Sequence, residues 1–175
     1  MEKFKRIVRH LWLDTSDAKR AVPPELLHRL TQQVAISERG HTGQVRICVE
    51  ASLPMSYLRR LSGQTNINQL VRERAVMLFG KLRVWDTEQN NGVLIYLQLA
   101  EHAIEIVADR GLSRHVQPQD WDVLTQHMGT AFGEGRFEIG LTQAMEEVST
   151  LLVRHFPAVA GEIRADELPN EPVIN

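Results

Sequence analysis

The sequence predicts an α/β protein, a three-layer α/β/α sandwich built on a small mixed sheet. Two observations lead to this prediction. The first is a strand, a helix and a strand in succession: apolar and polar residues alternate over 44–51, a helical pattern spans 67–82, and residues 93–100 are almost continuously apolar. These three segments predict a βαβ unit, in which the strands run parallel through a right-handed crossover.

The second observation is a hairpin that adds an antiparallel strand. Residues 103–109 have a strand-like pattern, and only Glu101-His102 need form the turn. A two-residue turn would place Leu94 opposite Asp109. Asn90-Asn91-Gly92, just before the first strand of the hairpin, predicts a turn, because Asn and Gly tolerate positive φ. The loop before that strand should therefore meet Asp109-Arg110-Gly111 at one end of the sheet.

Further segments have the apolar periodicity of helices, which should cover both faces of the sheet. They are residues 3–13, the segment from Pro23-Pro24 to Gly40, a segment that Pro118 opens, and residues 137–156. The domain prediction has three parts: residues 1–20 form a basic amphipathic helix and a link, residues 21–157 the α/β domain, and residues 158–175 a flexible tail. Truncation of that tail is expected to leave the melting temperature nearly unchanged.

Length and composition limit the functional classes to which the protein can belong. A chain of 175 residues is about one domain, and its net charge of −2 gives no reason to expect nucleic acid. The single Cys48 excludes an internal disulfide. No apolar run approaches the ~20 residues that span a bilayer, and the start lacks the features of a signal peptide. The protein is expected in the cytoplasm, where the helix over residues 3–13 either packs on its own domain or lies peripherally on an anionic membrane or a partner.

The loop end of the sheet is the first candidate site. Because strands 44–51 and 93–100 should run parallel, residues that precede both strands meet there. They offer carboxylate and amide oxygens, which calcium and magnesium prefer, and one imidazole. The residues are Glu38, His41, Asp86, Asn90, Asn91 and Asp109. The alternative is capping and turn chemistry, since the spacing matches no fixed metal motif.

These residues resemble the TPM domain family. The stretch from Val84 to Tyr96, with Asn-Asn-Gly-Val-Leu at its centre, and the following Ile104 to Leu112 are similar to the core of that domain. The family is named after a thylakoid-lumen protein, a photosystem-associated protein and a modulator of acetylcholine receptors. The resemblance covers roughly residues 24–156 and implies an α/β fold; some members are described as metal-binding phosphatases. The residues of this chain that match the family pattern are Asp86, Asn90, Asn91 and Gly92, together with the turn at Gly111.

Two departures from the family pattern matter. Many members have a Gly-rich, aromatic turn after the second strand of the hairpin, where this chain has Ala108-Asp-Arg-Gly111. Many members are also exported or membrane-tethered, and this chain shows neither signal. The resemblance therefore indicates a cytoplasmic, bacterial-type member.

Two functional hypotheses follow. The first is a TPM-like interaction domain that binds a membrane-associated protein partner and carries a divalent-cation site made by Asp86, Asn90, Asn91 and Asp109. The second is a metal-dependent phosphatase of phosphomonoesters, in which Asp86 and Asp109 hold the cation and Arg110 stabilises phosphoryl charge. The sequence slightly favours the first, because it offers no unmistakable nucleophile.

The opposite end of the sheet holds a second polar group. Its residues are Glu50, Ser52, Glu101 and His102. Ligands of open α/β sheets usually bind at this end, beyond the carboxyl ends of parallel strands. The interpretation preferred here is an exposed tight turn without a ligand.

Overall fold

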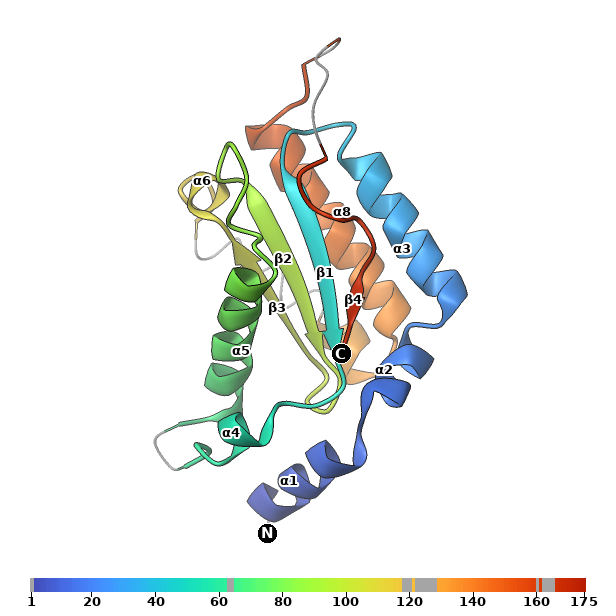
Figure 1. Cartoon of the computed structure of the whole chain (residues 1–175), viewed down its shortest axis with the longest axis vertical. Coiled ribbons are helices and arrows are strands. Elements are labelled where there is room, and N and C mark those ends of the chain that lie inside the picture. Colours follow the sequence, from blue (N-terminus) through green and yellow to red (C-terminus); the bar gives the residue numbers. More distant parts are fainter. Residues whose placement is uncertain (1, 63–64, 118–120, 122–128, 160, 162–165) are drawn as a thin grey trace.

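The computed structural model describes residues 2–62, 65–117, 121, 129–159, 161 and 166–175. Within these ranges, four strands form one mixed sheet in the order β3–β2–β1–β4, with helices on both faces (Figure 1). The strands are β1 (Gln44–Glu50), β2 (Gly92–Gln98), β3 (Ala103–Ala108) and β4 (Val173–Ile174). β1 and β2 pair in parallel and β2 and β3 antiparallel, as the sequence predicts.

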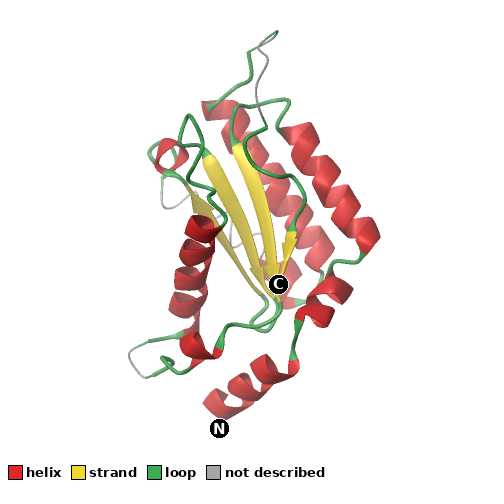
Figure 2. Cartoon of the chain, in the orientation of Figure 1, coloured by secondary structure: helices red, strands yellow, loops and turns green. Residues whose placement is uncertain are grey.

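The helices make the outer layers of the sandwich (Figure 2). α3 (Pro24–Ser37) and α8 (Phe137–His155) pack on one face of the sheet, and α5 (Ile67–Lys81) packs on the other. Shorter helices are α2 (Thr15–Ala21), α4 (Met55–Leu58) and α6 (Arg110–Ser113). Alternation along β1 sends Ile47 to the α3–α8 side and Cys48 to the α5 side. The three-layer prediction is confirmed.

The hairpin is confirmed, but its register differs from the predicted one. The turn comprises the four residues 99–102, so Leu94 pairs with Val107 and not with Asp109. Asp109 instead lies beside Gly92, whose carbonyl accepts its N–H at 2.9 Å. Because the shift is two residues, every side chain of β3 keeps its predicted face.

The longer turn has a physical cause on the other side of β2. The N–H groups of Leu99 and Ala100 donate to the carbonyls of Glu50 and Ala51 at 3.0 and 3.1 Å. These two residues therefore continue the pairing with the β1 side, and they do not extend the β3 ladder. His102 closes the turn with φ of 50°, a conformation that the apolar pattern of β2 gives no means to predict.

The end of the chain differs from the expectation of a flexible tail. Residues 173–174 form β4 beside β1, and Leu168 is buried. The side-chain amide oxygen of Gln44 (Oε1) accepts the backbone N–H groups of Glu167 and Leu168 at 3.1 and 3.0 Å, and Arg46 donates to two tail carbonyls. Residues 166–175 therefore cover the edge of β1, which the short apolar pattern of the tail does not reveal.

Other boundaries differ less. The link before the domain contains α2, which a capping box between Asp14 and Asp17 begins and which buries Ala18. The helix predicted from Pro118 falls largely on residues 118–120 and 122–128, which lie outside the described residues. No helix among the described residues is long and apolar enough to cross a bilayer; the cytoplasmic location stays a prediction.

Candidate functional site

The loop before β2 is held close to its neighbours by two glycines. A Cβ on Gly92 would overlap the carbonyl oxygen of Val84, and a Cβ on Gly111 would overlap that of Asn90. Asn90 has φ of 53°, and its carbonyl accepts the N–H of Gly111 at 2.8 Å. The loop and the start of α6 are therefore in backbone contact, as the sequence predicts for Asn90-Asn91-Gly92 and Asp109-Arg110-Gly111.

Two carboxylates of this loop end have structural partners. Asp86 forms an exposed ion pair with Arg83 at 2.5 Å. Asp109 begins α6, and its Oδ1 accepts the N–H of Arg110 at 2.6 Å. Both contacts are capping and turn chemistry, the alternative to a metal site at this end of the sheet. The side chain of Arg110 is on the surface.

Two oxygens at the loop end lack a donor. Asn91 is completely buried; its amide nitrogen donates to Thr42 and Gln89 at 3.1 and 3.4 Å, while its Oδ1 has no hydrogen-bond partner. Oδ2 of Asp109 is also buried without a partner. Buried polar oxygens are nearly always satisfied in folded proteins. These two atoms therefore distinguish Asn91 and Asp109 from the other residues of the predicted set.

Glu38 and His41 lie at the start of β1 and have structural partners. The carboxylate of Glu38 accepts the N–H of Val45 at 3.0 Å, and burial, with a smaller contribution from the charge of Asp166, raises the pKa of Glu38 to about 7. His41 is buried, and its Nδ1 lies 3.0 Å from the carbonyl of Gly43. A carbonyl only accepts, so Nδ1 carries the proton, and the ring has a fixed orientation.

The pKa of Glu38 gives a testable pH dependence. A folded-state pKa near 7, above the ordinary 4.5, means that stability from Glu38 is present at low pH and is lost as pH rises toward 7 and beyond. We expect Glu38→Gln to be more stable than wild type by about 1–2 kcal/mol at about pH 8, after allowance for solvent screening, and nearly equal at about pH 5. Urea unfolding at both pH values measures this difference. Glu88→Gln, at an exposed position of the same end, should show no such dependence; parallel behaviour of both variants would refute the assignment.

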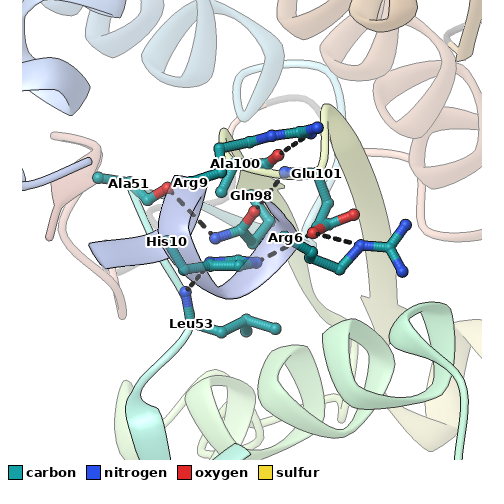
Figure 3. Close-up of polar contacts among 8 residues, drawn as sticks. All are labelled: Arg6, Arg9, His10, Ala51, Leu53, Gln98, Ala100 and Glu101. Carbon is teal, nitrogen blue, oxygen red and sulfur yellow. Dashed lines mark hydrogen bonds and ion pairs between the residues drawn. The ribbon is translucent and has the colours of Figure 1, made fainter. Parts of the chain in front are cut away.

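A second polar cluster, which the sequence analysis missed, joins the amino-terminal helix to the hairpin turn (Figure 3). α1 (Glu2–Trp12) presents its basic face to the turn, and Glu101 accepts from Arg6 and His10, each at 3.0 Å. Arg9 donates to the carbonyl of Ala100 at 2.9 Å. We call Arg6, Arg9, His10, Ala100 and Glu101 the hairpin-turn cluster.

Within the hairpin-turn cluster, His10 and Ala100 are buried and the Glu101 side chain is only 7% exposed, whereas Arg9 is on the surface. Nδ1 of His10 accepts the N–H of Leu53 at 3.0 Å, so the neutral ring carries its proton on Nε2 and donates it to Glu101. Gln98 is fully buried and accepts the N–H of Glu101 at 2.9 Å. The expectation that Glu101 is part of an exposed turn is wrong, because only 7% of its side chain is exposed. The 91 residues between His10 and Glu101 leave no local spacing that would signal the contact.

Glu50, at the same end of the sheet, is also buried and paired. Arg74 donates to both of its carboxylate oxygens, at 3.0 and 2.5 Å, and the Tyr96 hydroxyl donates at 2.6 Å. Burial raises the pKa of the nearby Cys48 to about 12. Glu50 thus holds α5 to the sheet, and the buried Cys48 thiol is unreactive because its high pKa leaves almost no thiolate.

The comparisons with known proteins agree with this architecture. The TPM domain matches residues 16–151. The chain belongs to the TPM domain family. Among solved structures, the NMR structure of the BA42 protein from the psychrophilic bacterium Bizionia argentinensis is similar, with 26% identity and a TM-score of 0.69 over 85% of this chain and 92% of that one. No curated protein matches the chain.

The loop end and the hairpin lie inside the matched TPM domain, whereas α1 precedes it. Within the described residues, no group of three or more His, Cys, Asp and Glu side chains is placed to hold a metal ion. A cation at the loop end of this TPM domain would therefore depend on amide oxygens as well as carboxylates, the set that hard cations accept.

Proposed function

We propose that this TPM domain is a non-catalytic interaction domain that binds a divalent cation at its loop end. The observation that carries the proposal is the pair of buried oxygens without donors, Oδ1 of Asn91 and Oδ2 of Asp109. An oxygen withdrawn from water without a partner is unfavourable by about 1–3 kcal/mol. Calcium or magnesium would supply the missing positive partner to each.

The other predicted ligands would complete the set from the surface. Asn90 is half-buried in the backbone contact with Gly111, and Asp86 is exposed. Asp86 would exchange its exposed ion pair with Arg83 for the cation, a small loss because exposed pairs contribute about 0–1 kcal/mol. Asn91 and Asp109 are in this proposal the inner ligands, and Asp86 and Asn90 the outer ones.

Both candidate functions use Asp86 and Asp109 as cation ligands, so the contacts of these residues do not separate them. Interaction is favoured over hydrolysis because the sequence offers no unmistakable nucleophile. A metal-dependent phosphatase needs a water or side chain activated beside the metal. The exposed side chain of Arg110, whose backbone N–H donates to the Asp109 carboxylate, favours the phosphatase, since a guanidinium stabilises phosphoryl charge. The membrane-associated protein partner stays a prediction.

Thermal unfolding with chelator and with calcium or magnesium tests the cation site. A cation that binds only the folded chain should stabilise wild type by about 2.7 kcal/mol at a hundredfold excess over the dissociation constant. Asp109→Asn and Asp86→Asn should each abolish most of this gain, because a neutral amide is a weaker ligand for a hard cation. Glu88→Gln, the same charge change on the exposed part of the loop, should keep it. No shift in wild type, or an equal shift in all variants, would contradict the proposal.

Hydrolysis of a phosphomonoester, measured on the same proteins, distinguishes the two functions. The interaction domain predicts no turnover with either cation. Turnover that is lost in Asp86→Asn and in Arg110→Ala, while Arg110→Ala keeps the cation-dependent shift, would instead identify the metal-dependent phosphatase.

A further inference from the structure

α1 is an amphipathic helix whose orientation is the reverse of the usual one. Its basic face is turned toward the domain through the hairpin-turn cluster (Figure 3). The apolar face is therefore exposed: Phe4 is 73% exposed, Leu11 64% and Trp12 82%. In a helix packed on its own domain, these side chains would be in the core. α1 therefore packs on its own domain, as one of the two sequence-based alternatives has it, but it does so through its basic face.

The polar contacts fix this orientation. His10 is buried between Leu53 and Glu101, and Arg6 binds Glu101 from the adjacent turn of the helix. Residues 6 and 10 lie on one side of a helix, and residues 4 and 11 lie on the side away from them. As long as Glu101 holds both partners, the apolar face must point outward.

The charge around the apolar face is basic. Residues 1–13 carry four Lys or Arg and one Glu, a charge of +3, so the rest of the chain carries −5. Lys5 and Arg9 are exposed. Lys5 precedes Trp12 by seven residues, so the ammonium and the indole share one margin of the apolar face. Aromatic and basic side chains at that margin are typical of helices that lie in a membrane interface.

We propose that α1 is a membrane-docking helix, which lies in the plane of an anionic lipid bilayer with Phe4, Leu11 and Trp12 among the acyl chains. The basic side chains beside the face meet anionic headgroups, whereas the net negative remainder of the chain is repelled from them. The charge favours an anionic over a neutral surface, and the exposed Phe4, Leu11 and Trp12 with basic side chains at their margin fit a lipid interface, which takes apolar contact and headgroup charge together.

The proposal sets the orientation of the molecule on the bilayer. α1 lies beyond the ends of β1 and β2, and the loop before β2 lies at the other end of the sheet beside α6 (Figure 1). With α1 on the bilayer, the loop-end residues Asn91 and Asp109 face away from the lipid. The docking proposal is independent of the cation site, since the two occupy opposite ends of the molecule.

Co-sedimentation with vesicles tests the proposal. We expect the wild-type chain to pellet with vesicles of phosphatidylcholine and phosphatidylserine, to pellet weakly with phosphatidylcholine alone, and to lose binding as salt is added. Phe4→Ser with Leu11→Ser should weaken binding by about tenfold or more, and Lys5→Gln by about fivefold. Vesicles should also shift the tryptophan emission to the blue, and Trp12→Phe should remove that shift.

Ile36→Ser is the matched control, since Ile36 of α3 is 61% exposed and lies outside α1; it should bind like wild type. Melting temperatures of all variants near that of wild type exclude unfolding as the cause. Equal losses in Ile36→Ser and in the Phe4, Leu11 variant would overturn the proposal, as would absence of pelleting with both vesicles. A dimer without lipid that Phe4→Ser with Leu11→Ser converts to a monomer would assign the face to a second copy of the chain and overturn it too.

Discussion

Deletion of residues 166–175 is expected to lower the unfolding free energy by about 3 kcal/mol or more. The deletion removes β4 from the edge of β1 and exposes the space that the buried Leu168 fills. Loss of one buried leucine is unfavourable by about 1.5–3 kcal/mol, and each lost hydrogen bond adds about 0.5–1.5 kcal/mol before the gain in chain entropy. For a chain of this size, 3 kcal/mol corresponds to roughly 6–12 °C in melting temperature.

The deletion should also change how the protein associates. Without β4, the backbone of β1 presents unpaired N–H and carbonyl groups, among them the carbonyl of Val49 and the N–H of Ala51 that Asn175 now binds at 2.9 and 3.0 Å. Such edges pair with other chains. Calorimetry and light scattering measure the two effects. Val159→Ser, at a residue 66% exposed, is the control and should leave both unchanged. An unaltered melting temperature after deletion would restore the expectation of a tail that adds little.

The sequence predicted the core of the fold because the relevant signals are local. The apolar run of β2, the alternation in β1 and the periodicity of α5 each depend on neighbours in the chain, and each element begins and ends within about two residues of its prediction. The docking of the tail cannot be predicted from local signals, because its attachment is not local. Gln44 and Arg46 bind residues more than a hundred positions away, and two paired residues give no periodicity.

The same distinction between local and distant contacts applies to the two sites. The meeting of Asn90 with Gly111 follows from the hairpin and was predicted, whereas the oxygens of Asn91 and Asp109 stand out only when the other partners of each side chain are known. The amphipathic pattern of α1 predicted a helix with one apolar face, but not which face the domain takes. That choice depends on Glu101, which a local analysis treats as a residue of an exposed turn.

Gly92→Ala is expected to be the most damaging single substitution at the loop end. The added Cβ would overlap the carbonyl oxygen of Val84, a backbone atom that no side-chain rotation can move. The chain must then separate the loop from the start of β2, where Gly92 also accepts the N–H of Asp109 at 2.9 Å. Overpacking usually costs about 1–3 kcal/mol, and we expect about 3 kcal/mol or more here because the obstacle is backbone.

The matched control is Gly80→Ala within α5, where an added Cβ meets nothing within 4 Å. There alanine has the higher helix propensity, so the substitution should stabilise the protein by about 0.5–1 kcal/mol. Urea unfolding of both variants measures this opposite pair of effects. If the cation proposal holds, Gly92→Ala should also reduce the calcium- or magnesium-dependent gain, because it displaces Asn91 and Asp109 together, whereas Gly80→Ala should retain it. A Gly92→Ala protein as stable as wild type would mean that the loop yields easily, and the close backbone contact would then not be what positions Asn91.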